Sequence, residues 1–240
     1  MNQPIFVADC RYIEALREAF GRFGTFVPSV PCKTLAEPES CHPDMALYAD
    51  AENTVICAPP VYEAYRRLLS TFGVTLVQGK ITPGRDYPEN VAYNVLNAGG
   101  FAFAKWAGAE PQIVDLLEKR GIVRHHVAQG YARCSALAFA DSVITADPSI
   151  ARAAADSGLS VLQIEPGHIC LPGYDYGFIG GASGLLDART VGFFGDLRLH
   201  PNGDAIRSFI TARGFSVCDV PHRPLTDVGT ILMVKSSFSV

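Results

Sequence analysis

The stretch MALYADAENTVICAPPVYEAYRRLLSTFGVTLV, residues 45–77, holds one complete repeating unit of this protein. Two short apolar segments, 45–48 and 54–57, are joined by a polar turn, as in a β-hairpin. Apolar residues at helical spacing follow from Val61 to Phe72, and Gly73 then ends the helix before a third apolar segment. The stretch therefore predicts two strands, a helix and a third strand, which together form a ββαβ unit.

The same pattern occurs five times along the chain. Each of five amphipathic helices is expected to end at a positive-φ glycine, and an apolar strand follows each one. These glycines are Gly24, Gly73, Gly121, Gly158 and Gly214. Because they are separated by 37 to 56 residues, the 240 residues divide into five units of about 48.

A hairpin is expected before each helix, and its first strand is the inner strand of the unit. The expected inner strands are 45–48, 91–96, 135–139, 179–186 and 228–234. The last of these pairs with residues 5–8, so the fifth unit combines both ends of the chain. The pattern predicts an α/β fold, a five-bladed α/β-propeller with pseudo-fivefold symmetry in a single domain of residues 1–240. The alternative is a doubly wound sheet, but that fold needs one strand between helices where this chain has room for three.

Composition and charge exclude several classes of function. With 48% apolar and 18% charged residues the chain is expected to fold compactly. A net charge of −4 and a pI of about 5.8 argue against nucleic acid as the partner. No segment resembles a membrane span or a signal peptide, and none of the seven cysteines forms a C-x-x-C pair. We therefore expect a cytoplasmic protein with reduced thiols, no membrane association and an undetermined oligomeric state.

Several motifs resemble a known superfamily. They are CHPDMALYAD at 41–50, GYARCS at 130–135, YGFIGGASG at 176–184 and DVGT at 227–230. With the five units, they resemble the pentein superfamily of guanidino-group-modifying enzymes, and in particular an uncharacterised bacterial branch of it. The superfamily includes arginine deiminase, agmatine deiminase, dimethylarginine dimethylaminohydrolase, amidinotransferase and a non-catalytic ribosome anti-association factor. The resemblance implies the propeller fold and chemistry on guanidino groups through a cysteine.

The chain departs from the enzymes of that superfamily at two positions. They carry the nucleophilic cysteine in the last inner strand, whereas residues 225–232 here read LTDVGTIL. They carry a general-acid histidine in the third unit, but no histidine begins that unit here. The enzymatic roles therefore cannot be transferred residue by residue.

A site rotated by whole units could preserve the chemistry. In a strand, His42 and Asp44 would share one face, and Cys134 follows His42 by about two units. We expect Cys134 to attack a guanidino or amidino carbon, His42 to transfer protons and Asp44 to orient the imidazole. Arg133 would point to the opposite face of its strand. Expected substrate-binding residues for a small cationic molecule are Asp227, Asn94, Ser183 and Tyr174, with no metal ion and no cofactor.

Each of these expectations has an alternative. Cys134 could be a small buried side chain or a redox-sensitive thiol, and His42 to Asp44 could form a turn. The glycine-rich stretch 177–184 lacks the spacing of a phosphate loop and is expected instead to allow close backbone approach. The whole protein could be a catalytically silent propeller that binds a small ligand or a protein partner.

Overall fold

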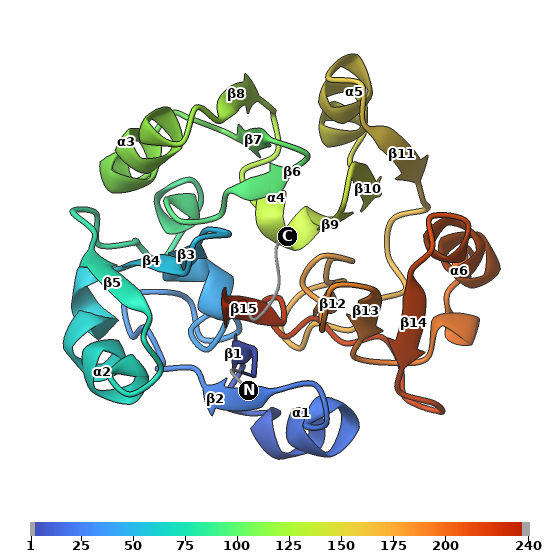
Figure 1. Cartoon of the computed structure of the whole chain (residues 1–240), viewed down its shortest axis with the longest axis horizontal. Coiled ribbons are helices and arrows are strands. Elements are labelled where there is room, and N and C mark those ends of the chain that lie inside the picture. Colours follow the sequence, from blue (N-terminus) through green and yellow to red (C-terminus); the bar gives the residue numbers. More distant parts are fainter. Residues whose placement is uncertain (1–2, 237–240) are drawn as a thin grey trace.

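The structure is a computed structural model that describes residues 3–236. Five separate three-stranded sheets surround a common centre, and helices lie on the outside (Figure 1). In every sheet an antiparallel inner pair is followed, after a helix, by an outer strand parallel to the middle one. This arrangement confirms the predicted repeat of five ββαβ-like units and contradicts a doubly wound sheet.

Four units are continuous in sequence. Their elements are β3 (Leu47–Ala49), β4 (Thr54–Cys57), α2 (Pro59–Leu69) and β5 (Thr75–Gln78); β6 (Leu96–Ala98), β7 (Phe101–Ala104), α3 (Pro111–Lys119) and β8 (Val123–His126); β9 (Ala136–Phe139), β10 (Ser142–Thr145), α5 (Pro148–Asp156) and β11 (Ser160–Gln163); and β12 (Ser183–Leu185), β13 (Thr190–Phe193), α6 (Gly203–Thr211) and β14 (Ser216–Asp219). The fifth unit combines both ends of the described chain, as predicted: β15 (Leu232–Lys235), β1 (Ile5–Ala8), α1 (Ile13–Phe20) and β2 (Thr25–Pro28).

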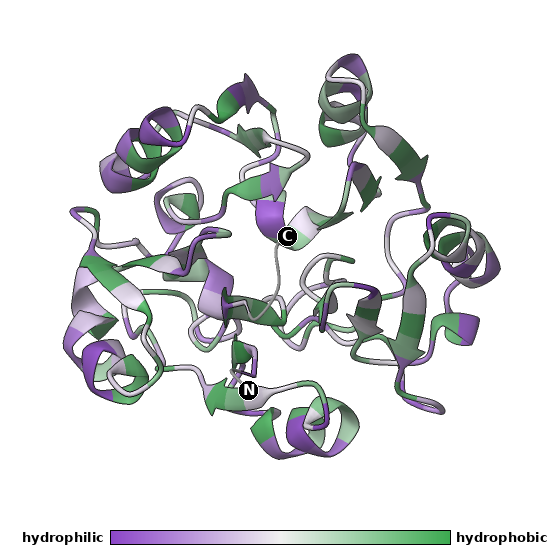
Figure 2. Cartoon of the chain, in the orientation of Figure 1, coloured by the Kyte–Doolittle hydropathy of each residue, from purple (hydrophilic) through white to green (hydrophobic). Residues whose placement is uncertain are grey.

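Helix capping and apolar burial explain why these elements form. The Asp147 carboxylate accepts hydrogen bonds from the amides of Ser149 and Ile150, and Pro148 occupies the first turn of α5. Hydrophobic residues follow the strands, while the helices expose hydrophilic residues (Figure 2). Within residues 3–236, no helix is both long enough and apolar enough to cross a membrane.

Four of the five predicted helix-terminal glycines have the expected backbone. Their φ values are 67° at Gly73, 68° at Gly121, 82° at Gly158 and 75° at Gly214. The prediction is wrong for Gly24, which does not adopt a positive φ, because α1 already ends at Phe20. A Cβ at residue 24 would clash with the carbonyl oxygen of Pro4, so close packing requires this glycine.

The inner strands begin later than predicted, because short turns precede three of them. These turns are the 3-10 helices η1 (Pro43–Met45) and η2 (Glu89–Val91) and the short helix α4 (Ala132–Ser135). Pro43 favours a turn because its ring fixes φ at a helical value. His42 and Asp44 therefore do not share a strand face, and Cys134 lies in a helical turn.

Candidate active site

A cavity of about 240 Å³ lies where η1 and α4 meet the loop before β12 and the loop before β15. The volume is below the roughly 300–1,000 Å³ of a pocket for a drug-sized ligand, so it suits a small molecule. Its lining contains acidic, aromatic and thiol side chains: Glu39, His42, Met45, Tyr131, Cys134, Leu171, Tyr174, Asp175, Tyr176, Phe178 and Asp227. Cys134 and His42, which the sequence predicts to act together, thus line one cavity.

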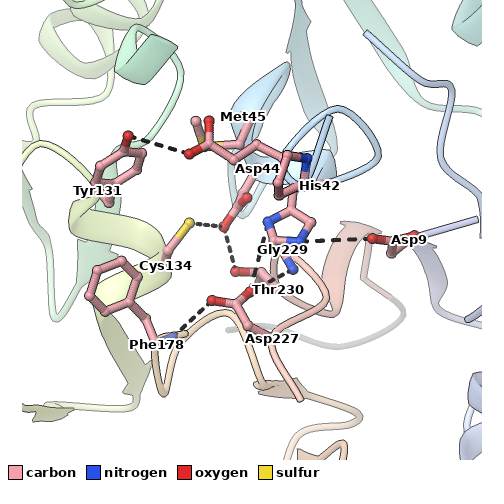
Figure 3. A network of polar contacts seen from close by, with 12 residues as sticks. Asp9, His42, Asp44, Met45, Tyr131, Cys134, Phe178, Asp227, Gly229 and Thr230 are labelled. Carbon is pink, nitrogen blue, oxygen red and sulfur yellow. Dashed lines mark hydrogen bonds and ion pairs between the residues drawn. The ribbon is translucent and has the colours of Figure 1, made fainter. Parts of the chain in front are cut away.

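Asp44 and Asn94 hold the thiol of Cys134 in place, and Figure 3 shows the contact with Asp44. The thiol donates to Oδ2 of Asp44 at 2.9 Å and accepts from Nδ2 of Asn94 at 3.1 Å. The Oδ1 atom of Asn94 also accepts from the backbone amides of Arg133 and Cys134. Burial and the carboxylates of Asp44 and Asp227 raise the pKa of Cys134 well above its ordinary value. The thiol is therefore protonated at neutral pH.

Asp44 is a buried acceptor that joins three units of the fold, its own and those of Cys134 and Thr230. Its Oδ2 atom also accepts from the hydroxyl of Thr230 at 2.8 Å. Its Oδ1 atom is buried and has no hydrogen-bond partner among the described residues. Asp44 thus contacts Cys134 and Thr230. The expected hydrogen bond between Asp44 and His42 does not form, because the turn of η1 separates the two side chains.

His42 lies between two other carboxylates. Its Nε2 atom is 3.8 Å from Oδ2 of Asp9, and its Nδ1 atom is 3.8 Å from Oδ1 of Asp227 (Figure 3). Burial raises the pKa of Asp227, while the neighbouring His42 lowers it. The backbone amides of Phe178 and Gly229 also donate to Asp227, at 2.9 Å each. The imidazole is thus placed where its charged form has carboxylates on both sides.

Sequence reasoning missed Thr230. This β-branched residue has a φ of 73°, a strained conformation that often occurs at functional sites. Only 1% of its surface is exposed, and its hydroxyl lies between Asp44 and the carbonyl oxygen of Gly180. In the DVGT motif the sequence indicates Asp227 and the absence of a cysteine, but no sequence signal predicts the strained backbone of Thr230.

Sequence reasoning also missed Glu39. This carboxylate is 5% exposed and accepts hydrogen bonds from Nδ2 of Asn90 at 2.8 Å and from the hydroxyl of Tyr174 at 2.7 Å. The hydroxyl of Tyr131 donates to it at 3.4 Å. Glu39 lies in an irregular loop without a motif, which is why only the three-dimensional structure connects it with the cavity.

Aromatic rings form the mouth of the cavity. The side chains of Tyr174 and Tyr176 are 46% and 45% exposed. The ring of Phe178 contacts Tyr176 edge-on and contacts Tyr131 at a tilt. Burial and the adjacent Glu39 carboxylate raise the pKa of Tyr174, so its hydroxyl remains a donor at neutral pH. Aromatic faces beside carboxylates favour a cationic ligand.

The remaining predicted residues lie elsewhere. Asn94 is behind the thiol and does not line the cavity. Ser183 also does not line it, because its buried hydroxyl donates to the carbonyl oxygen of Ile179. Arg133 lines a different cavity. A Cβ at Gly181 would clash with Asp227, which confirms that the glycine-rich stretch allows close approach at the centre.

The described residues include one group of possible metal ligands that the sequence did not indicate. Ligand atoms of Asp9, Cys10 and Cys41 lie within 4.8 Å of one another. However, the Asp9 carboxylate already forms a bidentate ion pair with Arg11, with its shortest distance at 2.6 Å. A cation bound there would have to compete with this guanidinium.

Comparisons with known proteins support the fold. Residues 7–232 match the sequence model described as "Family of unknown function (DUF6873)". No curated protein matches the sequence. Among solved structures, SxtG, described as an amidinotransferase from Microseira wollei in the saxitoxin biosynthetic pathway, is similar to this chain with a TM-score of 0.57. The two are 11% identical, and the match covers 96% of this chain and 80% of SxtG. The likeness supports a pentein-like fold.

Proposed function

The chain belongs to this family of unknown function, DUF6873, and we propose that it is an enzyme that acts on a small guanidino or amidino compound through Cys134. The observation that carries the proposal is a thiol in a small cavity whose walls hold Glu39, His42 and Asp227. The likeness to a protein described as an amidinotransferase supports the same class of chemistry.

The charge distribution favours a cationic substrate. The Asp227 and Glu39 carboxylates line the cavity, Asp44 lies just behind the thiol, and His42 is the one basic side chain in the lining. Buried negative charge without a counter-ion is unfavourable, so a planar cation would be bound strongly. The aromatic rings at the mouth would pack against its face.

Substrate binding would also activate the thiol. The negative charges of Asp44 and Asp227 raise the pKa of the Cys134 thiol. A cationic substrate beside Cys134 would offset these charges and lower that pKa. The thiol proton then passes along the existing hydrogen bond to Asp44. The resulting thiolate is positioned to attack only when a cationic substrate is present.

The proposed reaction has two steps. The Cys134 sulfur forms a bond to the guanidino carbon, and the bond from that carbon to the leaving amine breaks as protonated His42 donates a proton to the amine. Water, deprotonated by His42, then attacks the amidino carbon, and the carbon–sulfur bond breaks as the thiolate regains its proton from Asp44. An acceptor amine in place of water would give group transfer.

The second candidate is a catalytically silent protein that binds the same cation. The raised pKa of Cys134 favours this alternative, because a permanently protonated thiol is a weak nucleophile. Binding would then depend on Glu39 and Asp227 but leave the thiol unmodified.

A panel of guanidino and amidino compounds distinguishes the two candidates. We expect release of ammonia or amine and a covalent mass increase on Cys134, both absent in Cys134→Ser. Cys218→Ser is the matched control, because this half-buried thiol interacts with Arg22 outside the cavity. Saturable binding of a panel member without turnover or adduct would support the silent protein and contradict the enzyme.

A further inference from the structure

A second cavity, of about 150 Å³, is lined by the inner strands of all five units. Arg133 and Cys134 are adjacent in α4, but Arg133 lines this second cavity and Cys134 lines the first. The cavity extends to the exposed turn at Ala51 between β3 and β4. It is therefore a separate, reachable space on the opposite side of α4 from the thiol.

The guanidinium of Arg133 interacts electrostatically with Asp44 but makes no direct contact with an acceptor among the described residues. No acceptor within residues 3–236 hydrogen-bonds to it, and none of the ion pairs there includes it. The nearby carboxylate in the lining, Asp50, is paired with Arg120 at 3.2 Å. Arg133 is partly buried and lines the cavity, and burial lowers the pKa of its guanidinium while Asp44 raises it.

Tyr48 provides a second donor to the same space. Its hydroxyl accepts a hydrogen bond from Nδ2 of Asn97 at 2.7 Å, while its own proton has no acceptor among the described residues. The side chain is only 3% exposed, and burial raises the pKa of Tyr48 to about 12. The hydroxyl therefore remains a neutral donor at physiological pH.

We propose that this second cavity binds a small organic carboxylate, held by hydrogen bonds from Arg133 and Tyr48. A guanidinium matches both oxygens of a carboxylate, and the tyrosine proton can reach a remaining lone pair. The rest of the lining is mainly aliphatic, which suits a short hydrocarbon chain better than a fully hydrated anion such as phosphate: Leu47, Val95, Leu185, Leu232 and Met233.

Calorimetric titration of the full chain with butyrate tests the proposal. We expect one site, with at least tenfold weaker binding to Arg133→Met and severalfold weaker binding to Tyr48→Phe, which removes only the hydroxyl. Binding to Cys134→Ser should match the wild type, because that thiol lines the other cavity. Thermal melting of each variant verifies that it is folded.

Three results would overturn the proposal. The first is that butyrate does not bind detectably to the wild type. The second is that the wild type, Arg133→Met and Tyr48→Phe all bind butyrate equally well. The third is that only Cys134→Ser loses binding. Stronger binding of phosphate than of butyrate would also contradict the assignment to an organic carboxylate. Because the proposed turnover is measured with cationic compounds, failure at either site is recognised independently.

Discussion

The ionisation of a single thiol depends on the carboxylates around it. Asp44 both accepts the Cys134 proton and raises the thiol pKa through its negative charge. We predict that Asp44→Asn makes the thiol react faster with iodoacetamide at neutral pH, because the charge is removed, while turnover falls at least tenfold. Peptide mass spectrometry of Cys134 over a range of pH measures the labelling.

Glu39→Gln is the control for this prediction. It should weaken substrate binding but leave the rate of labelling unchanged. Slower labelling in Asp44→Asn than in the wild type would contradict the role assigned to Asp44.

Asp227 links the cavity to stability. Its pKa is raised by burial, so the folded state binds this proton more tightly than the unfolded state. The stability it contributes is present below the ordinary carboxyl pKa and is lost as pH rises through the raised value. We predict that the free energy of unfolding of Asp227→Asn, relative to wild type, improves between pH 4 and pH 7, because the wild type loses this stability over that range.

Urea unfolding at the two pH values measures this difference. Asp175→Asn is the control, because this carboxylate is exposed at the mouth of the same cavity. A relative stability of Asp227→Asn that does not change with pH would contradict the role given to burial.

At the scale of the elements, glycines at helix ends have separable roles. Gly121 follows α3 with a φ of 68°, and a Cβ there would meet no atom within 4 Å. We predict that Gly121→Ala costs about 1 kcal/mol through backbone strain alone, and that Gly121→Asn costs less. Gly24→Ala should cost more, because its Cβ clashes with Pro4. Denaturant unfolding measures the stability of all three variants. An unchanged stability of Gly121→Ala would contradict the strain assigned to the positive φ at this position.

The elements were predictable where the signal is periodic and local. Helical spacing followed by a glycine predicted five helices, each followed by an outer strand, as for α2 and β5. The inner strands were extended too far towards the centre. The turns there contain Pro43 and polar residues whose partners come from other units. For example, the side chain of Asn94 accepts a hydrogen bond from the backbone amide of Arg133. Such contacts have no local pattern, so the sequence placed His42, Asp44 and Cys134 near the centre but did not predict which of them contact one another.

The whole molecule brings chemistry together that no single unit contains. Cys134 comes from α4, Asp44 from η1, and Thr230 and Asp227 from the loop before β15, and these segments meet only because the units surround one centre (Figures 1 and 3). Residues 225–232 of the last unit hold no cysteine, and the thiol that lines the cavity comes from another unit. The same arrangement places Arg133 and Cys134 in different cavities.

The two cavities should communicate through charge. Cys134 interacts electrostatically with the Arg133 guanidinium, so this cation favours the thiolate form of Cys134. We predict that Arg133→Met slows iodoacetamide labelling of Cys134 severalfold, and that butyrate, by neutralising Arg133, slows the wild type similarly. Butyrate should have no further effect on Arg133→Met. If butyrate slowed labelling equally in both proteins, it would be acting at the thiol cavity itself, and the proposed coupling across α4 would be wrong.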